Sequence, residues 1–152
     1  MEPRFDLAKV TPAVYRAMLT LEHQVGKLGI EPALLHLIKL RASQINGCAY
    51  CIDMHSKDAR AGGETEQRLY ALNAWAETPF FTEKERAALA WTEAVTVIHQ
   101  ERVPDHVYEA ARSVFGEEEL ANLTLAIVAI NGWNRFSIAF RAVPGDYQPA
   151  AK

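Results

Sequence analysis

The sequence predicts an all-α protein, a single-domain helical bundle of about six to seven helices. Apolar residues recur at spacings of three and four along most of the chain, and segments that alternate apolar and polar residues are scarce. The chain has 152 residues with 49% hydrophobic content, enough for one core of its own, and no Pro/Gly/Ser-rich linker divides it. We therefore expect one domain over residues 1–152.

Proline, glycine and capping residues indicate where the helices begin and end. Pro12 and Pro32 suit the first turn of a helix, and Asn46 is a competent N-cap for a helix that opens at the next residue. Thr82 and Glu85 have the spacing of a capping box. The expected helices cover approximately residues 12–25, 32–43, 47–60, 65–75, 82–98, 104–115 and 117–139. The last of them is apolar enough to be buried for much of its length.

Composition and charge narrow the range of partners. The net charge is -3 at pH 7 and acidic and basic residues are interspersed, so nucleic acid is not an expected partner. Residues 1–6 include two acids and lead into no long apolar segment, unlike a secretion signal. The longest apolar stretch, residues 123–130, is far shorter than the roughly 20 residues that cross a bilayer. We expect a cytoplasmic protein with no membrane partner.

One short motif combines thiol and imidazole groups. Cys48 and Cys51 are the only two cysteines, and His55 follows four residues after the second. Their spacing places all three on one face of a helix. A thiol in the first turn can have its pKa lowered from roughly 8.5 to between about 3.5 and 7.5, which favours the thiolate at Cys48. His55 lies one turn from Cys51 and can act as its base, but the spacing does not decide which cysteine attacks.

Three interpretations of this motif compete. In the first, the two cysteines and the histidine merely line the core, as buried free cysteines often do. In the second, they ligate a metal with His36 as a fourth ligand, although the sequence has no second Cys-x-x-Cys and no His-x-x-x-His. The third, a redox dithiol, is favoured. A thioredoxin fold is set aside because helices, and not a strand within a βαβ unit, are expected around the motif.

The segment from Leu37 to His55 resembles the core motif of the alkylhydroperoxidase D (AhpD-like) branch of the carboxymuconolactone decarboxylase superfamily. The similarity continues through residues 56–60 and Glu64 and is weaker at residues 91–94 and 131–135. This resemblance implies an all-helical, AhpD-like fold and assembly as trimers or hexamers. It also implies that Cys51 is the peroxidatic cysteine, that Cys48 is the proton donor and resolving thiol, and that His55 is the base of a proton relay.

The chain departs from the family pattern at one position. The family's relay includes a glutamate twelve residues before the first cysteine, and His36 stands there instead. A neutral imidazole, with a pKa of about 6.5, can pass a proton but cannot stabilise a protonated His55 as a carboxylate would. We expect an altered relay that includes His36, with Glu93 or a water filling the gap. The alternative is that His36 is an ordinary helix residue that faces solvent.

The function expected from these features is a thiol-dependent peroxidase that reduces hydrogen peroxide or organic hydroperoxides. No Gly-rich dinucleotide fingerprint is present, so no cofactor is expected and electrons should come from an external dithiol reductant. The alternatives are an acid-base enzyme of the carboxymuconolactone decarboxylase type and a metal-binding protein without redox activity. A homo-oligomer is expected because the helices carry more apolar surface than a lone domain of this size readily buries.

Other residues are expected to have structural roles. His23, His99 and His106 are expected on the surface or partly buried, and Trp91 and Trp133 in the core or in subunit contacts. Residues 45–48 and 130–133 share Ile-Asn-Gly, either by coincidence or as the trace of a duplicated hairpin. If the hairpin is duplicated, Asn134 and Arg135 would follow a break at Gly132 and could border the site.

Overall fold

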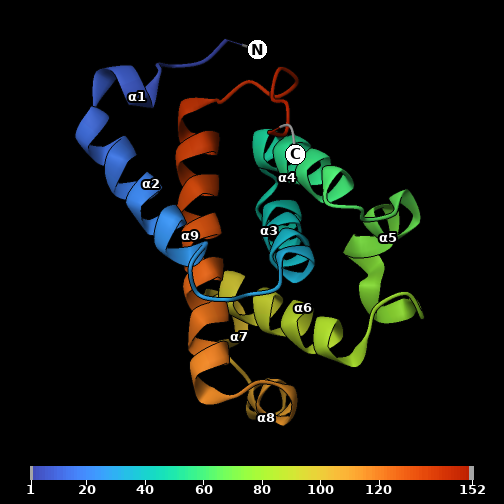
Figure 1. The fold of residues 1–152 in the computed structure, drawn as a ribbon. Coiled ribbons are helices and arrows are strands. Elements are labelled where there is room, and N and C mark those ends of the chain that lie inside the picture. The colour runs from blue at the N-terminus through green and yellow to red at the C-terminus, as the bar shows by residue number, and fades with distance from the viewer. Residues whose placement is uncertain (1, 151–152) are drawn as a thin grey trace.

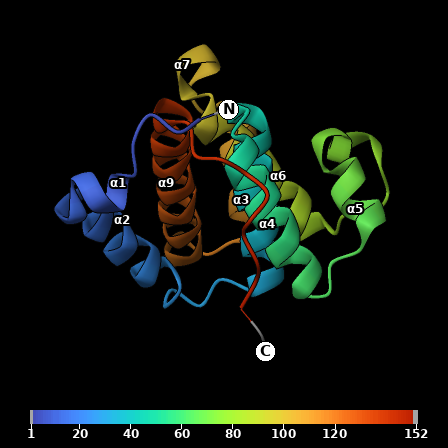
Figure 2. The same ribbon diagram turned by 90° about the horizontal axis from the view of Figure 1, so that it is seen from above.

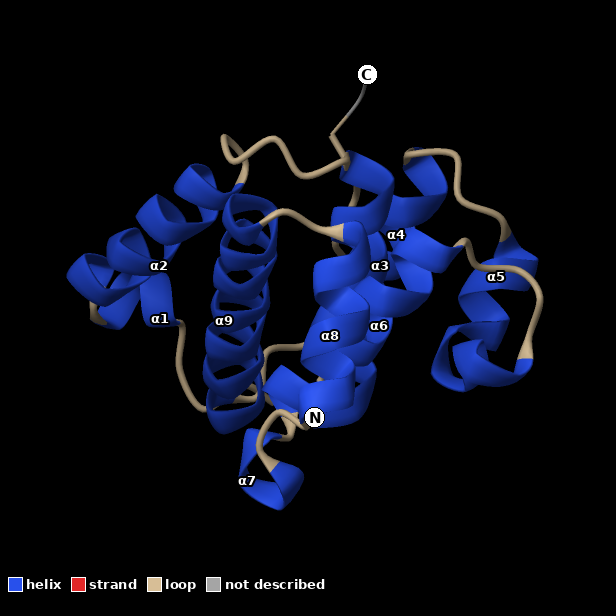
Figure 3. Cartoon of the chain, turned by 90° about the horizontal axis from the view of Figure 1, so that it is seen from below, coloured by secondary structure: helices blue, strands red, loops and turns tan. Residues whose placement is uncertain are grey.

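The structure, a computed structural model, describes residues 2–150 (Figure 1). Within that part the chain forms nine α-helices and one 3-10 helix and no strand, so the predicted all-α class is confirmed (Figure 3). The ends of the expected domain, residues 1, 151 and 152, lie outside the described residues. The elements are α1 (Leu7–Val10), α2 (Pro12–Val25), α3 (Pro32–Asn46), α4 (Ala49–Ala61), α5 (Glu66–Ala71), η1 (Leu72–Glu77), α6 (Glu83–Thr96), α7 (Ile98–Glu101), α8 (Asp105–Val114) and α9 (Glu117–Phe140).

The predicted helices correspond to α2, α3, α4, α5 with η1, α6, α8 and α9. Two four-residue helices, α1 and α7, were not predicted because a single turn carries no apolar periodicity. The capping box of Thr82 and Glu85 is present, with both hydrogen bonds made, and it begins α6. The N-terminal half of the expected 65–75 helix is α-helical and capped by Thr65, and the chain then tightens into the 3-10 helix η1.

Helices α3 and α9 lie side by side at the centre of the molecule (Figures 1 and 2). Helix α2 packs on the far side of α9, α4 packs on α3, and α6 runs across both central helices. Apolar side chains of α3 enter two core clusters: Ile38 packs with residues of α6 and α9, whereas Leu37 and Leu40 pack with residues of α4, η1 and α6. Such all-round burial is typical of a core helix and explains the near-continuous apolar sequence of α3.

The turn between α3 and α4 is tighter than the sequence predicts. Gly47 adopts a left-handed conformation, with φ 69° and ψ 32°, and ends α3. Cys48 is extended and is the N-cap of α4, where its Sγ accepts a hydrogen bond from the Cys51 N–H at 3.4 Å. The prediction that Asn46 caps a helix opening at Gly47 is therefore wrong, since Asn46 is the last residue of α3. A glycine in the left-handed region can end one helix and leave only one residue before the next.

Asparagine side chains connect this turn to α9. The Asn46 Nδ2 donates to Asn131 Oδ1 at 2.9 Å and to Asn134 Oδ1 at 2.8 Å. Asn134 is fully buried and its own Nδ2 donates to Ser43 Oγ at 3.1 Å. The two Ile-Asn-Gly segments therefore meet in space. The expected break at Gly132 is absent, because α9 continues through it; there the Met18 side chain of α2 occupies the space that a Cβ would need.

Helix α9 is long and apolar enough to cross a membrane by length and composition alone, with a mean hydropathy of 1.2. It packs against α2, α3, α4, α6 and α8, and 39% of its most apolar window is buried. A helix with this pattern of contacts is the core helix of a bundle, so the fold gives no indication of a membrane location.

Replacement of Asn46 by alanine tests the junction between the α3–α4 turn and α9. Asn46→Ala removes the donor that satisfies the buried Asn134 Oδ1, and a buried acceptor left without a partner costs about 1–3 kcal/mol. We expect the free energy of unfolding, measured by urea titration, to fall by that amount. Asn73→Ala is the control, because Asn73 is exposed on η1 and its loss should change stability by no more than about 0.5 kcal/mol. Equal stability of both variants would contradict the proposed junction.

Candidate active site

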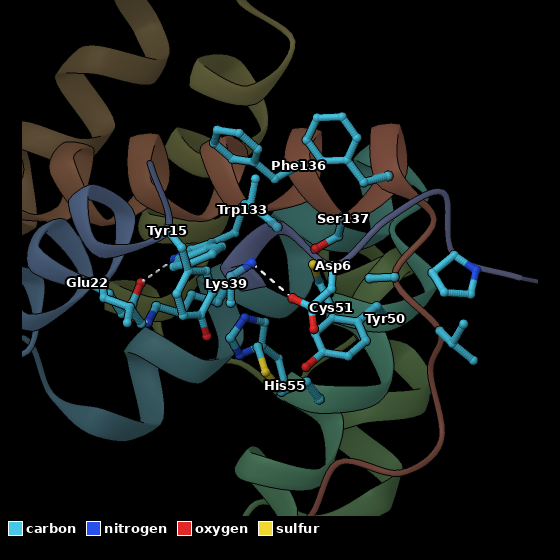
Figure 4. A pocket seen from close by; sticks show the side chains of 18 of the residues that line it. Asp6, Tyr15, Glu22, Lys39, Tyr50, Cys51, His55, Trp133, Phe136 and Ser137 are labelled. Atoms are coloured by element: carbon cyan, nitrogen blue, oxygen red, sulfur yellow. Dashed lines mark hydrogen bonds and ion pairs between the residues drawn. The ribbon is translucent and has the colours of Figure 1, made fainter. Parts of the chain in front are cut away.

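Three of the four residues predicted for the site line one large cavity. The cavity has a volume of about 760 Å³ and is lined by the N-terminal segment, α1, α2, α3, α4, α9 and the residues that follow α9. Cys51 and His55 reach it from α4 (Figure 4). His36 reaches it from α3. Cys48 is not part of the cavity wall; it lies behind Cys51 at the α4 N-cap. The two thiols therefore differ in access: Cys51 lines the cavity and Cys48 does not.

Aromatic side chains form much of the remaining wall. Tyr15, Tyr50, Trp133 and Phe136 surround the reactive side chains in Figure 4. Farther out, the Phe5 ring stacks on Phe140 with centroids 4.2 Å apart, which ties the N-terminal segment to the end of α9. The wall is therefore apolar over most of its area and is suited to a substrate with an apolar body.

The two thiols share one proton. Both cysteines are free and buried, each 1% exposed. Hydrogen bonds from the Cys51 thiol and from the Cys51 N–H lower the pKa of Cys48 to about 7, against the opposing effect of burial. The same thiol hydrogen bond, together with burial and the Cys48 charge, raises the pKa of Cys51. The first negative charge therefore resides on Cys48, and Cys51 is a protonated donor to it until its proton moves.

Two residues of α9 add to this stabilisation. Side-chain hydrogen bonds from Ser137 and Asn134 lower the pKa of both thiols. Asn134 was considered at the border of the site, and Ser137 was not predicted at all. The sequence signal was weak, because Asn134 and Ser137 lie three positions apart in a helix that holds other polar residues as well. Arg135 is exposed and donates to the Asn131 carbonyl at 2.9 Å, so it takes no part in the site.

His55 is a neutral imidazole inside the protein. Its side chain is buried, and neither ring nitrogen has a hydrogen-bond partner among the described residues. Burial, followed by the positive charges of Lys39 and His36, lowers the pKa of His55 to about 3. The nearest carboxylate is Asp58, whose Oδ2 lies 3.9 Å from His55 Nδ1. A neutral ring can accept a proton, but the resulting cation needs a counter-charge in such a buried place.

His36 faces the cavity and not only solvent. It is half-buried, and burial is the main cause that lowers its pKa. The Asp58 carboxylate acts to raise this pKa, and the Lys39 charge acts to lower it. Glu93 lies elsewhere: its Oε1 accepts hydrogen bonds from Arg41 Nε at 2.8 Å and Trp75 Nε1 at 2.7 Å. Glu93 therefore does not fill the gap left by the missing glutamate.

An ion pair between a buried lysine and a half-buried glutamate forms another side of the cavity. Lys39, only 7% exposed, pairs with Glu22, and Trp133 Nε1 donates to the second oxygen of that carboxylate at 3.2 Å. Trp133 was expected in the core or in a subunit contact; it packs against the core cluster that holds both cysteines and also lines the cavity, with Tyr15 edge-on to it at 5.8 Å. Trp91 is in the core as expected and donates to Thr124 Oγ1 at 2.9 Å. Lys39 was not predicted, although its charge within the apolar stretch of α3 was a signal.

The remaining histidines are placed as expected. His23, His99 and His106 are exposed. Among residues 2–150, no three His, Cys, Asp or Glu side chains come together in a way that could hold a metal ion. The metal interpretation of the motif therefore has no supporting set of ligands in the described part of the chain.

The fold and the site together define an all-helical protein with a dithiol at a helix N-terminus beside a large cavity. The family model for carboxymuconolactone decarboxylases matches residues 12–94. YdfG of Bacillus subtilis, an uncharacterised protein, is 45% identical over 139 residues, covering 91% of this chain and 95% of its own. YnjA of Escherichia coli, also uncharacterised, is 28% identical over 74% of this chain and 59% of its own.

Solved structures agree with this assignment. A protein of unknown function from Agrobacterium tumefaciens, named as a candidate antioxidant defence protein AhpD, has a TM-score of 0.93 and 44% identity, covering 96% of this chain and all of its own. The debrominase Bmp8 shares the fold, with a TM-score of 0.80 at 21% identity over 91% of this chain and 74% of its own. The chain belongs to the carboxymuconolactone decarboxylase family, among its AhpD-like members.

Substitution of Cys51 tests the shared proton. Cys51→Ala removes the thiol that donates to Cys48, whereas Cys51→Ser keeps a donor at the same place. We expect the pKa of Cys48, followed by thiolate absorbance at 240 nm, to rise by at least about one unit from about 7 in the alanine variant. The thiolate is then lost at a higher pH as the solution is acidified. The serine variant should titrate nearer the lower value. The same pKa in both variants would show that the thiol hydrogen bond has no effect.

Proposed function

We propose that the protein is a thiol-dependent peroxidase that reduces organic hydroperoxides or hydrogen peroxide through Cys51 and Cys48. One observation carries this proposal: Cys51 lines the cavity together with His55, while Cys48 lies behind it, out of the cavity wall but in hydrogen-bond contact. A substrate in the cavity meets Cys51 first. The cysteine that remains covered is then in place to attack the oxidised product.

The first step converts Cys51 to a sulfenic acid. Its proton leaves to the Cys48 thiolate or to the neutral His55, and the Cys51 thiolate attacks the outer oxygen of the peroxide. The O–O bond breaks, the outer OH stays on sulfur as a sulfenic acid, and the leaving alkoxide takes a proton from the Cys48 thiol or from protonated His55. One alcohol is released for each hydroperoxide, or one water for each hydrogen peroxide.

The second step closes a disulfide. The Cys48 thiolate attacks the Cys51 sulfenic sulfur and expels hydroxide, which leaves as water after it takes a proton. Two electrons have then passed from the dithiol to the peroxide. An external dithiol reduces the Cys48–Cys51 disulfide by exchange and is itself oxidised, which restores the enzyme.

The cavity supports an organic hydroperoxide more strongly than hydrogen peroxide. Its volume of about 760 Å³ is far larger than hydrogen peroxide needs, and aromatic rings form much of its wall. Such a wall gains contact area with an apolar body and offers nothing to a molecule of four atoms. The carboxylates of Asp6, Glu22 and Asp58 also line the cavity. These acids disfavour a substrate that carries its own carboxylate.

A carboxymuconolactone decarboxylase activity is the second candidate, because the family model bears that name. Such a reaction acts on a carboxylate and needs a cation to hold it. Lys39, the lysine that lines the cavity, is already paired with Glu22. The dithiol would also have no task in acid-base chemistry, so the peroxidase is the better supported of the two.

The proposal also covers the location of the protein, its reductant and its oligomeric state. A dithiol that is reset by thiol exchange works best where thiols are kept reduced, so we place the protein in the cytoplasm with an external dithiol as its reductant. We further propose a homo-oligomer, a trimer or hexamer. Large apolar side chains are exposed along α8 and α9, among them Tyr108, Leu125 and Val128, and a second copy would cover them.

Thiol counting tests the peroxidase proposal. One equivalent of peroxide should remove two titratable thiols from the wild type, because a disulfide forms. In Cys48→Ser the reaction should stop at a sulfenic acid on Cys51, which a dimedone probe traps; Cys51→Ser should trap none. Mass spectrometry distinguishes these products. No thiol loss under excess peroxide would sink the proposal.

The shape of the cavity predicts a preference among peroxides. Burial of a phenyl-bearing group against the aromatic wall should contribute about 1.5–3 kcal/mol, or roughly 10- to 100-fold. We therefore expect kcat/KM for cumene hydroperoxide to exceed that for hydrogen peroxide by at least tenfold. Trp133→Ala should reduce this ratio and leave the rate with hydrogen peroxide within about threefold. Equal ratios in the two proteins would show that the wall does not select the substrate.

A further inference from the structure

We infer that Asp58 supplies the carboxylate that the proton relay lacks, and that Tyr147 of the C-terminal segment holds Asp58 in place. The inference rests on the proposed peroxidase for the reaction that the relay serves. Asp58 acts through His55, and Tyr147 acts through Asp58, so both are positioning residues.

The first observation is the place of Asp58 relative to His55. Asp58 lies three residues after His55 on α4 and shares its face of the helix. It lines the same cavity, and its Oδ2 is 3.9 Å from His55 Nδ1. Both nitrogens of the buried ring are without a hydrogen-bond partner in the part of the chain that the structure describes. A buried polar atom rarely stays unpaired, so a small approach by either side chain would satisfy His55 Nδ1 with a carboxylate.

This arrangement gives each nitrogen of the ring a separate partner. A hydrogen on Nδ1 directed to Asp58 leaves Nε2 as the acceptor for a proton. Cys51 lies one turn away on the same helix and lines the same cavity. Cysteine, histidine and carboxylate then stand in the order of a catalytic triad, in which the third group orients the base and stabilises its cation.

The second observation is the hold of Tyr147 on Asp58. The Tyr147 hydroxyl donates to Asp58 Oδ1 at 2.6 Å, which leaves Oδ2 on the side of His55. Burial and the Asp58 carboxylate raise the pKa of Tyr147 to about 12, so the hydroxyl keeps its proton over the working pH range. Lys57 Nζ donates to the carbonyls of Gly145 at 2.8 Å and Tyr147 at 3.1 Å, and thereby fixes this segment on α4.

The charges around His55 make a carboxylate necessary. Lys39 and His36 of α3 both lower the pKa of His55, and the pairing of Glu22 with Lys39 offsets only the lysine. Asp58 is a carboxylate close to both imidazoles, since it also acts on His36 to raise its pKa. Asp58, one turn after His55 on α4, thus supplies the acid that the family places at position 36. His36 itself lies beside Asp58 in the cavity wall.

Alkylation of Cys51 tests the relay without peroxide. In a Cys48→Ser background Cys51 is the sole thiol, and its rate of reaction with iodoacetamide between pH 5 and 9 reports its deprotonation. We expect Asp58→Asn to slow the reaction at pH 7 about tenfold and to move the profile about one unit to higher pH, because the imidazolium that receives the proton has lost its partner. Tyr147→Phe should give a smaller shift in the same direction. Asp58→Glu should restore part of the rate.

Asp53→Asn is the matched control. Asp53 is another carboxylate of α4 that holds the same C-terminal segment, through the Gly145 N–H at 3.1 Å and Lys57 at 2.9 Å, but it makes no approach to His55. Because Asp53 acts on Tyr147 only through the backbone of that segment, Asp53→Asn should shift the profile less than Tyr147→Phe does. Thermal unfolding of each variant verifies that the fold is kept. An Asp58→Asn profile that matches Asp53→Asn, or a faster reaction in Asp58→Asn, overturns the inference.

Peroxide turnover in proteins that retain Cys48 separates the two proposals. If Asp58→Asn alters alkylation and the wild type reduces no peroxide, the peroxidase fails and the relay stands. If the wild type reduces peroxide and Asp58→Asn equals Asp53→Asn in both assays, the relay fails and the peroxidase stands.

Discussion

The site depends on the turn in which one helix ends and the next begins within two residues. Gly47 takes a left-handed conformation and Cys48 an extended one, so the Cys48 sulfur becomes the N-cap and receives the Cys51 N–H. The first turn of a helix is where unpaired N–H groups and the helix dipole favour negative charge. The same turn brings Asn46 against α9, whose Asn134 then reaches the thiols. A longer or looser turn would lose both effects at once.

That turn also decides how charge is distributed among buried groups. Two thiolates cannot lie side by side in a buried place, so the pair carries one charge and one shared proton. The neighbouring imidazole is neutral for the same reason, since burial and nearby cations lower the pKa of His55. Proton transfer within this group leaves its total charge unchanged. In the proposed peroxidase reaction, the protein would therefore avoid the cost of a new buried charge until the peroxide oxygen departs as an anion.

Much of the fold and the reacting pair could be predicted from the sequence, because both depend on local spacing. Helical periodicity located the major helices, and the spacing of Cys51 and His55 put both on the cavity side of α4, whereas Cys48 became the N-cap and lies off the cavity wall. What failed depends on contacts across the fold. Asn46 was taken for an N-cap because its type suits one, but the left-handed Gly47 gives that place to Cys48. Glu93 was a reasonable substitute carboxylate until the structure placed it with Arg41.

The origin of the cavity wall separates the proposed chemistry of the motif from the choice of substrate. The dithiol and His55 lie within residues 12–94, the part of the chain that the family model matches. Much of the wall comes from outside that part: Phe5 and Asp6 before it, and Trp133, Phe136 and Phe140 long after it. Changes in these outer segments can alter what enters the cavity without a change at either sulfur. The segment that holds Tyr147 also lies outside residues 12–94, near the end of the chain, and the Tyr147 hydroxyl donates to Asp58. A relative with the same motif but a different C-terminal segment would share the proposed disulfide chemistry and differ in the proposed proton relay.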